Sequence, residues 1–197
     1  MTDKTPKSII GIDEAGRGPL AGPVYVGLAK IGPEANLGQI DSLNDSKQMS
    51  EMNREAVFAK LEDGSLRGIE SAHTYTTSKV IDEVGINHAI QLALNRGLRK
   101  LQPINSRTKV LLDGGLTAPA KYNQQTITKG DQKRKEISLA SVVAKVARDN
   151  HMRRLDDKYA NFSFGQHKGY GTKRHRENIQ VYGATNIHRR TFVRSGE

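Results

Sequence analysis

The 197-residue sequence contains no cysteine and no tryptophan, and only 5% of its residues are aromatic. Without cysteine the chain has no disulfides and no thiolate metal ligands, which suits a reducing compartment. No apolar run reaches the roughly 18 residues that a transmembrane helix requires. The opening residues, MTDKTPKSII, also lack the apolar core of a secretory signal. We therefore expect a cytoplasmic protein that does not interact with membranes.

Acidic residues are in the minority. The chain holds 31 Lys and Arg against 21 Asp and Glu, which gives a formal net charge of +10. Residues 145–197 contain 12 of the basic and 5 of the acidic residues, so most of the excess lies in the last quarter. A basic surface of this kind attracts polyanions, nucleic acid first. A solubilising role explains the same charges equally well at this point.

Several motifs of other enzyme classes are missing. The stretch GRGPLAG does not match G-x-G-x-x-G, and neither G-x-x-x-x-G-K-[ST] nor G-x-S-x-G occurs. The six histidines show no H-E-x-x-H spacing, so they do not predict a zinc site. These absences disfavour nucleotide-binding folds, serine hydrolases and zinc enzymes.

Apolar patterns predict an α/β fold. We expect strands at residues 8–13, 24–31, 68–76, 109–113 and 125–128, and helices at 50–63 (capped by Ser50), 78–101, 139–155 and from 172 onward. In the second helix, apolar residues recur at every fourth position, at Ile86, Ile90, Leu94 and Leu98. Strands interleaved with helices predict a single domain, residues 1–197, with a mixed central β-sheet flanked by helices. We expect the helical and basic C-terminal part, about 145–197, to pack on this domain.

Four acidic residues follow or end predicted strands and have glycine close by: Asp13, Glu14, Asp113 and Asp131. A buried acid is costly unless a cation or a hydrogen-bond donor answers it. If the four converge, Mg²⁺ or Mn²⁺ would relieve their repulsion. Each acid alone is also explained as a turn former or a helix cap. Because adjacent strand residues point to opposite faces, the strand must end or distort at Glu14 if both adjacent acids serve one site.

A series of segments, in order along nearly the whole chain, resembles the motifs of one enzyme family. The segments are GIDEAGRGPLAGPV from residue 11, LNDSK at 43–47, LLDGG at 111–115, KGD at 129–131, ISLASVVAKVARD at 137–149, HKGYGTKRH from 167 and IHRRTF from 187. Together they resemble the type 2 ribonucleases H, the ribonuclease HII family. One such segment would be modest support, whereas the ordered series is very specific.

The resemblance implies an RNase H-like fold and a metal-dependent endonuclease. Such enzymes cut the RNA strand of RNA/DNA hybrids and incise at ribonucleotides embedded in duplex DNA. By their positions in the motifs, the four acids are implied to be catalytic and to bind the metal. The residues implied to sense the ribose 2′-OH are Gly16, Arg17, Gly18 and Tyr170. The sister type, ribonuclease HIII, usually has an extra N-terminal domain and lacks this tyrosine, so Tyr170 and the early position of Asp13 favour type 2.

Cleavage of a phosphodiester requires an in-line nucleophile, a stabilised leaving oxygen and charge neutralisation at phosphorus. Two Mg²⁺ or Mn²⁺ ions can meet all three needs. We expect the second ion to bind only with substrate, because Mg²⁺ keeps much of its hydration. We expect Asp13 to bridge the ions, and incision 5′ to a lone ribonucleotide to leave 5′-phosphate and 3′-hydroxyl ends.

Basic residues near the motifs are candidate phosphate ligands, which set affinity but read no sequence. They are Lys47, Lys145, Lys168, Lys173, Arg174 and Arg176. Lys145 has a second interpretation, as a neighbour that supports the acids from the helix that also carries Ser141. For Asp149 we expect a structural ion pair rather than a bound metal.

Two other interpretations are considered. A non-catalytic nucleic-acid-binding protein would explain the charge but not four acids at strand ends. Another RNase H-like phosphoryl transferase, such as a junction resolvase or an integrase, would share the acids but not Gly-Arg-Gly or the tyrosine of HKGYGT. We expect RNA/DNA hybrid and ribonucleotide-containing duplex DNA as partners, and a monomer in solution. The final residues, VRSGE, show no motif for docking on a sliding clamp.

Overall fold

The sheet expected from the sequence is present. A computed structural model of the protein describes residues 7–40, 49–103 and 105–194. Its five strands are β1 (Ser8–Ala15), β2 (Val24–Ile31), β3 (Ile69–Thr76), β4 (Thr108–Asp113) and β5 (Asn123–Ile127). They lie in the order β3-β2-β1-β4-β5, with β1 antiparallel to β2 and parallel to β4. The predicted mixed α/β fold is therefore confirmed.

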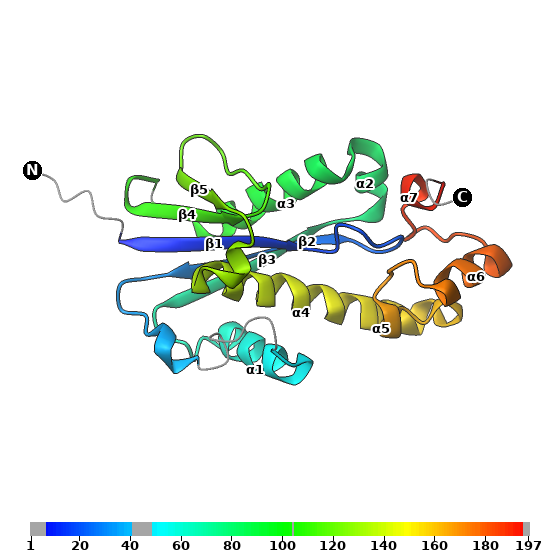
Figure 1. The fold of residues 1–197 in the computed structure, drawn as a ribbon, viewed down its shortest axis with the longest axis horizontal. Coiled ribbons are helices and arrows are strands. Elements are labelled where there is room, and N and C mark those ends of the chain that lie inside the picture. The colour runs from blue at the N-terminus through cyan, green and yellow to red at the C-terminus, as the bar shows by residue number, and fades with distance from the viewer. Residues whose placement is uncertain (1–6, 41–48, 104, 195–197) are drawn as a thin grey trace, which may run out of the picture.

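Helices cover both faces of this sheet (Figure 1). They are α1 (Glu51–Glu62), α2 (Ser78–Val84), α3 (Ile86–Leu101), α4 (Lys135–Lys158), α5 (Phe164–His167), α6 (Lys173–Tyr182) and α7 (Arg190–Arg194). On one face α3 packs against β2 and β3, and on the other α4 packs against β1 and β2, with α1 outside it. The short helices α5, α6 and α7 gather at one end of the sheet. No helix in the described part of the chain is both long and apolar enough to cross a membrane.

Side chains of β1 alternate between the two faces, as the pleat of a strand requires. Ile10 and Ile12 belong to the apolar core beneath α3. Gly11 and Asp13 lie in the other direction, toward α4, where Asp13 reaches the hydroxyl of Ser141. The strand therefore places a carboxylate on the α4 side of the sheet.

Two glycines bring α4 very close to the sheet. A Cβ atom on Gly11 would lie 2.0 Å from the carbonyl oxygen of Glu136, and a Cβ atom on Gly27 would lie 2.2 Å from that of Ala140. Neither position has room for a side chain, so the backbone of α4 rests directly on β1 and β2. This contact carries Ser141, the residue after Ala140, to the end of β1.

Some element boundaries differ from the sequence prediction. The helix expected at 78–101 is two helices, because Gly85 (φ +79°) ends α2 and precedes α3. Strand β1 continues through Glu14 to Ala15, so it ends two residues later than expected and lacks the break at Glu14 that a site shared by both acids was expected to require. The expected N-cap is confirmed, since the side chain of Ser50 accepts a hydrogen bond from the N–H of Asn53 at 3.2 Å.

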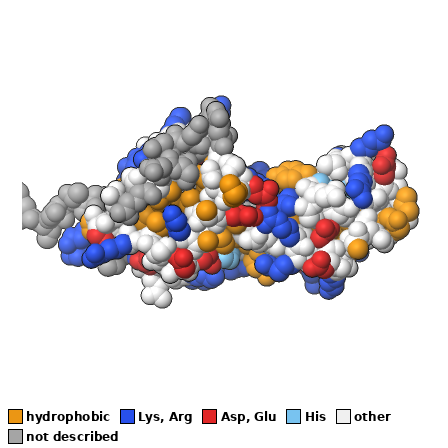
Figure 2. All heavy atoms as spheres, turned by 90° about the horizontal axis from the view of Figure 1, so that it is seen from below, with side chains coloured by type: hydrophobic (Ala, Val, Ile, Leu, Met, Phe, Trp, Pro, Cys, Tyr) orange, Lys and Arg blue, Asp and Glu red, His pale blue; other side chains and the backbone are white. Residues whose placement is uncertain are grey.

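Basic and acidic side chains are mixed on the side of the molecule that carries α1 and α4. Figure 2 shows this side, where Lys and Arg are interspersed with Asp and Glu rather than gathered in one continuous patch. Ion pairs account for part of this mixing, for example between Arg153 of α4 and Glu55 of α1, at 2.8 Å. Charge alone therefore does not outline a binding surface on this side.

The close approach of α4 predicts that Gly27 tolerates no side chain. We expect Gly27→Ala to lower the free energy of unfolding by about 1–3 kcal/mol, the usual cost of overpacking a core. Urea denaturation followed by circular dichroism measures this change. Gly115→Ala is the matched control, because no atom lies within 4 Å of a Cβ at that position, and it should change stability by less than about 0.5 kcal/mol. Equal stability of the two variants would contradict a tight contact.

Candidate active site

Asp13 and Asp113 lie side by side at the ends of two neighbouring parallel strands. Ile12 of β1 pairs with Leu112 of β4, so the next residue on each strand is an aspartate. Both aspartates follow the alternation of their strands onto the face covered by α4. The fold thus brings together two of the four predicted acids, and the charge of Asp113 acts on Asp13.

Asp13 is buried, with 7% of its surface exposed. Burial, with smaller contributions from the charges of Glu14 and Asp113, raises the pKa of its carboxyl from 3.8 to about 7. A hydrogen bond from Ser141 acts in the opposite direction, and the N–H of Glu14 donates to Asp13 Oδ1 at 2.7 Å. An ionised carboxylate without a counter-charge is costly in this setting. A bound cation would remove that cost.

Glu14 points to the opposite face of the sheet from Asp13, because β1 stays paired with β2 through Ala15. Its carboxylate accepts a hydrogen bond from Arg17 Nε at 2.9 Å, and Arg17 also donates to Asn87 of α3 at 2.6 Å. The charge of Glu14 nevertheless acts on Asp13, and Glu14 lines a hollow together with Ser141, whose hydroxyl contacts Asp13.

Two hollows meet at this end of the sheet. The larger, about 280 Å³, is lined by Glu14, Ala15, Gly16, Arg17, Gly18, Arg148 and Tyr170. The smaller, about 160 Å³, is lined by Met49, Arg54, Asp131, Ser138 and Val142. Ser141 and Lys145 of α4 line both. Glu14 and Asp131 therefore lie on either side of Ser141, whose hydroxyl contacts Asp13.

Asp113 connects the strand ends to the fourth acid. Its Oδ1 accepts a hydrogen bond from the N–H of Gly130 at 2.5 Å, which holds the short helix η4 (Gly130–Gln132) and with it Asp131. These oxygen donors suit Mg²⁺ or Mn²⁺. Within residues 7–40, 49–103 and 105–194, no three His, Asp or Glu side chains form a ready-made metal cage. A metal held here would complete its coordination with water and phosphate oxygens.

Arg148 holds together two loops that line the larger hollow. This residue is 2% exposed, and its guanidinium donates to the backbone carbonyls of Pro23 at 3.1 Å, Ala21 at 3.4 Å and Lys168 at 2.8 Å. It thereby joins the loop between β1 and β2, residues 16–23, to the loop that carries Tyr170. The sequence segment ISLASVVAKVARD includes Arg148, yet nothing in its spacing indicates this role.

Gly16 and Tyr170 both contact Arg148. Gly16 adopts φ +91°, and a Cβ atom there would lie 2.0 Å from Arg148 Nε, so only glycine fits. The centre of the Tyr170 ring lies 5.8 Å from the guanidinium carbon. Tyr170 is 48% exposed, which leaves part of its ring free to contact a ligand in the larger hollow.

A pair of buried histidines supports the Tyr170 loop. His175 Nδ1 lies 2.9 Å from the carbonyl oxygen of Tyr170, and His175 Nε2 lies 3.1 Å from His188 Nε2. The second ring nitrogen of His188 accepts the N–H of Thr185 at 2.9 Å. One proton on each ring satisfies this whole chain of hydrogen bonds, so both histidines are neutral. Burial lowers the pKa of each to about 4.

The predicted basic residues are scattered around the site. Lys145 lines both hollows and forms an ion pair with Asp149 at 2.6 Å, which confirms the structural pairing expected for Asp149. The ammonium of Lys168 donates to the carbonyl of Gly165. Lys47 lies outside the described residues. The remaining candidates, Lys173, Arg174 and Arg176, lie on α6.

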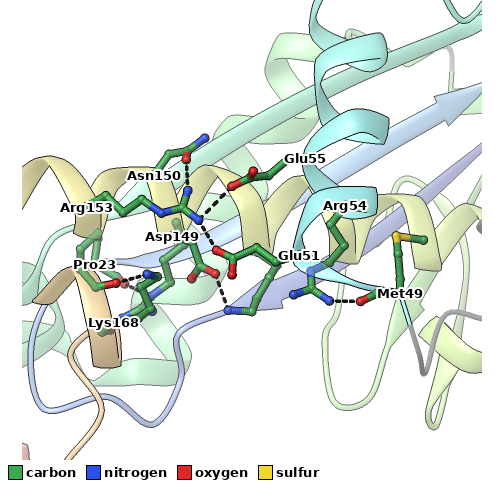
Figure 3. Close-up of polar contacts among 12 residues, drawn as sticks. Pro23, Met49, Glu51, Arg54, Glu55, Asp149, Asn150, Arg153 and Lys168 are labelled. Carbon is green, nitrogen blue, oxygen red and sulfur yellow. Dashed lines mark hydrogen bonds and ion pairs between the residues drawn. The ribbon is translucent and has the colours of Figure 1, made fainter.

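Sequence reasoning missed Arg54, which comes to the smaller hollow on α1. In Figure 3 its guanidinium donates to the carbonyl of Met49. Nearby, Arg153 of α4 forms ion pairs with Glu51 and Glu55, which join α1 to α4 (Figure 3). No sequence signal marks Arg54, because its place depends on how α1 packs against α4.

The fold and the site together define a class of protein. The mixed sheet, in the order β3-β2-β1-β4-β5 with helices on both faces, is shared with a solved ribonuclease H2, so the protein has an RNase H-like fold. The sequence model of the family described as Ribonuclease HII matches residues 10–195. The chain belongs to this family. It is therefore a divalent-metal-dependent endoribonuclease H, a hydrolase that cuts the RNA strand of RNA/DNA hybrids.

Individual relatives agree with this assignment. Ribonuclease HII of Nitrosomonas europaea is 42% identical over 187 residues, which cover 95% of this chain and 83% of that protein. The crystal structure of the ribonuclease H2 from Pyrococcus horikoshii OT3 is similar with a TM-score of 0.71 at 31% identity, covering 95% of this chain and 96% of that one. Bst-RNase HIII, solved in complex with Mn²⁺, shares the fold with a TM-score of 0.65 at 15% identity, over 92% of this chain and 64% of that one. The expected family and fold are thus confirmed.

The histidine pair predicts a loss of stability in mild acid. Because the folded pKa values lie below the ordinary 6.5, the unfolded chain takes up protons first as the pH falls. The pair's contribution to stability is therefore complete above pH 6.5 and declines toward pH 4. We expect His188→Gln to flatten the pH dependence of the free energy of unfolding in this window, measured by urea denaturation.

His88→Gln, at an exposed position of α3, is the control for this measurement. It removes a histidine without touching the pair and should keep the pH dependence of the wild type. If His188→Gln kept that dependence as well, the buried pair would not be its source.

Proposed function

We propose that the protein, besides cutting RNA/DNA hybrids, incises duplex DNA on the 5′ side of a single embedded ribonucleotide and leaves 5′-phosphate and 3′-hydroxyl ends. One observation carries this proposal. The larger hollow is lined by Glu14 together with the Gly16–Gly18 segment and Tyr170. The ribose of a single nucleotide bound there can contact the Gly16–Gly18 segment and Tyr170 while its neighbouring phosphate lies near the acids.

We assign the acidic end of the hollow to phosphodiester cleavage. The residues that would hold divalent metal, two ions with substrate bound, are Asp13, Glu14, Asp113 and Asp131. Such metal supplies an activated water and neutralises charge on the phosphate and the leaving oxygen. The hydrogen bond from Ser141 holds the Asp13 carboxylate in place, while burial and the charges of Glu14 and Asp113 raise the pKa of Asp13. The oxygen-only donor set supports this assignment.

We assign the Gly16–Gly18 segment and Tyr170, which line the same hollow as Glu14, to recognition of the ribose. The 2′-OH is the group that distinguishes RNA from DNA at one nucleotide. Gly16 and Gly18 carry no side chain to block close approach, so backbone groups of this segment can hydrogen-bond to a hydroxyl. The half-exposed ring of Tyr170, backed by Arg148, suits stacking against the sugar. Contacts to one ribose from both loops, the Gly16–Gly18 segment and Tyr170, would make recognition specific for a single ribonucleotide.

Phosphate contacts on either side of the cut nucleotide belong to the basic residues of the two hollows. Lys145 lines both, and Arg54 lines the smaller one beside Asp131. We assign them to substrate phosphates, together with the predicted Lys47 and Lys168. Contacts of this kind fix the register of the duplex and make binding weaken as salt rises.

The proposed metal site predicts that Asp13→Asn abolishes incision without abolishing binding. The assay is a labelled DNA duplex with one ribonucleotide, with Mg²⁺, Mn²⁺ or chelator, resolved on a denaturing gel. We expect metal-dependent incision 5′ to the ribonucleotide by the wild type and none on the all-DNA duplex. Asp157→Asn, an exposed acid on the same helix as Ser141, should cut like the wild type.

A measurement on the protein alone tests the same site. A metal that binds only the folded state raises the melting temperature by mass action. We therefore expect Mn²⁺ to raise the melting temperature of the wild type and of Asp157→Asn, and to raise it much less in Asp13→Asn. Binding of this duplex by the wild type without incision would contradict the proposed incision at single ribonucleotides, and so would cutting of branched all-DNA substrates.

The role given to Tyr170 predicts a loss that depends on the substrate. On a long hybrid every residue of one strand carries a 2′-OH, whereas a lone ribonucleotide offers a single productive position. We expect Tyr170→Ala to lower kcat/KM on the lone ribonucleotide about tenfold more than on the hybrid, a difference of about 1.4 kcal/mol in the two barriers. Tyr182→Ala, an exposed tyrosine of α6, is the control. Equal losses on both substrates would remove Tyr170 from recognition.

A further inference from the structure

The loop of residues 16–23 is held by a segment from the far end of the sequence. The N–H of Gly22 donates to the carbonyl of Ile187, and the N–H of Arg189 donates to that of Leu20, both at 2.8 Å. These bonds form a short antiparallel bridge between the loop and residues that lie about 170 positions later in the chain. The backbone of Arg189 is thereby fixed against the loop.

The side chain of Arg189 then turns back onto the same loop. It is fully buried, and its guanidinium donates to the carbonyl oxygens of Gly16 at 2.6 Å, Arg17 at 2.9 Å and Gly22 at 3.0 Å. Among the ion pairs of the described residues, none includes Arg189. The buried charge is answered by three carbonyl dipoles, all from the loop. Such a charge is held only if those carbonyls stay in place.

These contacts set the direction of two amide groups. In a planar trans peptide the carbonyl of one residue and the N–H of the next point in opposite directions. Because the carbonyls of Gly16 and Arg17 point at Arg189, the N–H groups of Arg17 and Gly18 point away from it. Arg17 and Gly18 line the larger hollow together with Tyr170.

Asp82 of α2 fixes the position of Arg189 from its other side. Its carboxylate accepts hydrogen bonds from the N–H groups of Arg190 at 2.8 Å and Thr191 at 3.0 Å, and from the Thr191 hydroxyl at 2.6 Å. These bonds tie the beginning of α7 to α2, directly after Arg189. The guanidinium is therefore carried by a backbone anchored on both sides.

We propose that Arg189 is a positioning residue for recognition of the ribose, which aims the N–H groups of Arg17 and Gly18 at the 2′-OH. This inference rests on the proposed incision at single ribonucleotides. Arg189 touches no substrate atom in this role. It fixes the positions of the backbone N–H groups that contact the ribose. A misplacement of such groups by about 1 Å can lower the rate about 100-fold.

The test compares Arg189→Met, which keeps the length but not the donors, with Arg189→Lys and Arg190→Met. We expect Arg189→Met to lower kcat about 100-fold on a duplex with one ribonucleotide and about tenfold or less on a long hybrid, with KM little changed. Arg189→Lys keeps the charge but cannot reach three carbonyls, so it should recover only part of the loss. Arg190→Met, at the exposed neighbouring position, should behave as the wild type. Equal losses on the two substrates would overturn the proposal.

Hydrogen exchange of the free protein separates this inference from the proposed function. We expect faster exchange in the segment 14–23 of Arg189→Met and unchanged exchange in Arg190→Met, whatever the substrate. If the wild type fails to incise at a lone ribonucleotide, the proposed function is lost while the exchange result still decides whether Arg189 holds the loop. If Arg189→Met does not fold, Asp82→Ala should show the same two effects more weakly. If Asp82→Ala left either the exchange of segment 14–23 or the ratio of kcat on the two substrates unchanged, the proposed role of Arg189 would be contradicted.

Discussion

The contact of α4 with the sheet, through Gly11 and Gly27, is the constraint on which the site depends. Because no side chain separates the two backbones, the position of every residue along α4 is fixed relative to β1 and β2. Ser141, Lys145 and Arg148 follow one another at helical spacing along one face of α4. The helix α4 thus places the hydroxyl of Ser141 at the acids, the ammonium of Lys145 between the two hollows, and the guanidinium of Arg148 against the loop of residues 16–23.

The buried charged groups at this end of the molecule differ in whether the protein supplies partners for their charge. Arg148 and Arg189 are each surrounded by backbone carbonyls, so their positive charges are satisfied within the protein. Asp13 has the opposite situation, because the nearest charges on it are those of other carboxylates. A cation would therefore be attracted to Asp13 and the carboxylates beside it.

Much of the fold and of the site is predictable from the sequence, and the limits have physical causes. The end of β4 at Asp113 can be found because a buried strand followed by glycine is a local pattern, whereas β1 continues two residues beyond the end expected at Asp13. The division of the helix at Gly85 is local as well, but a helix tolerates an isolated glycine, so periodicity alone does not reveal it. The family pattern contributes Gly16, Gly18 and Tyr170, which no periodicity would single out.

The rest could not be predicted because it depends on contacts between distant segments. Arg54, Arg148 and Arg189 look like ordinary surface arginines in the sequence, and only packing shows that two of them are buried. The strand end expected at Asp13 differs for a related reason. Pairing with β2 keeps β1 regular through Ala15, while the charge of Glu14 still acts on Asp13.

The bridge between residues 20–22 and 187–189 also has a consequence for the order of folding. Contacts between segments so far apart close a large loop of chain, and they form late because the entropy of that closure must be overcome first. During synthesis β1 and the loop of residues 16–23 leave the ribosome long before residues 187–189, which hold that loop. The loop therefore lacks this support while the strands and α4 are made, and it reaches its final geometry only after residues 187–189 have been added.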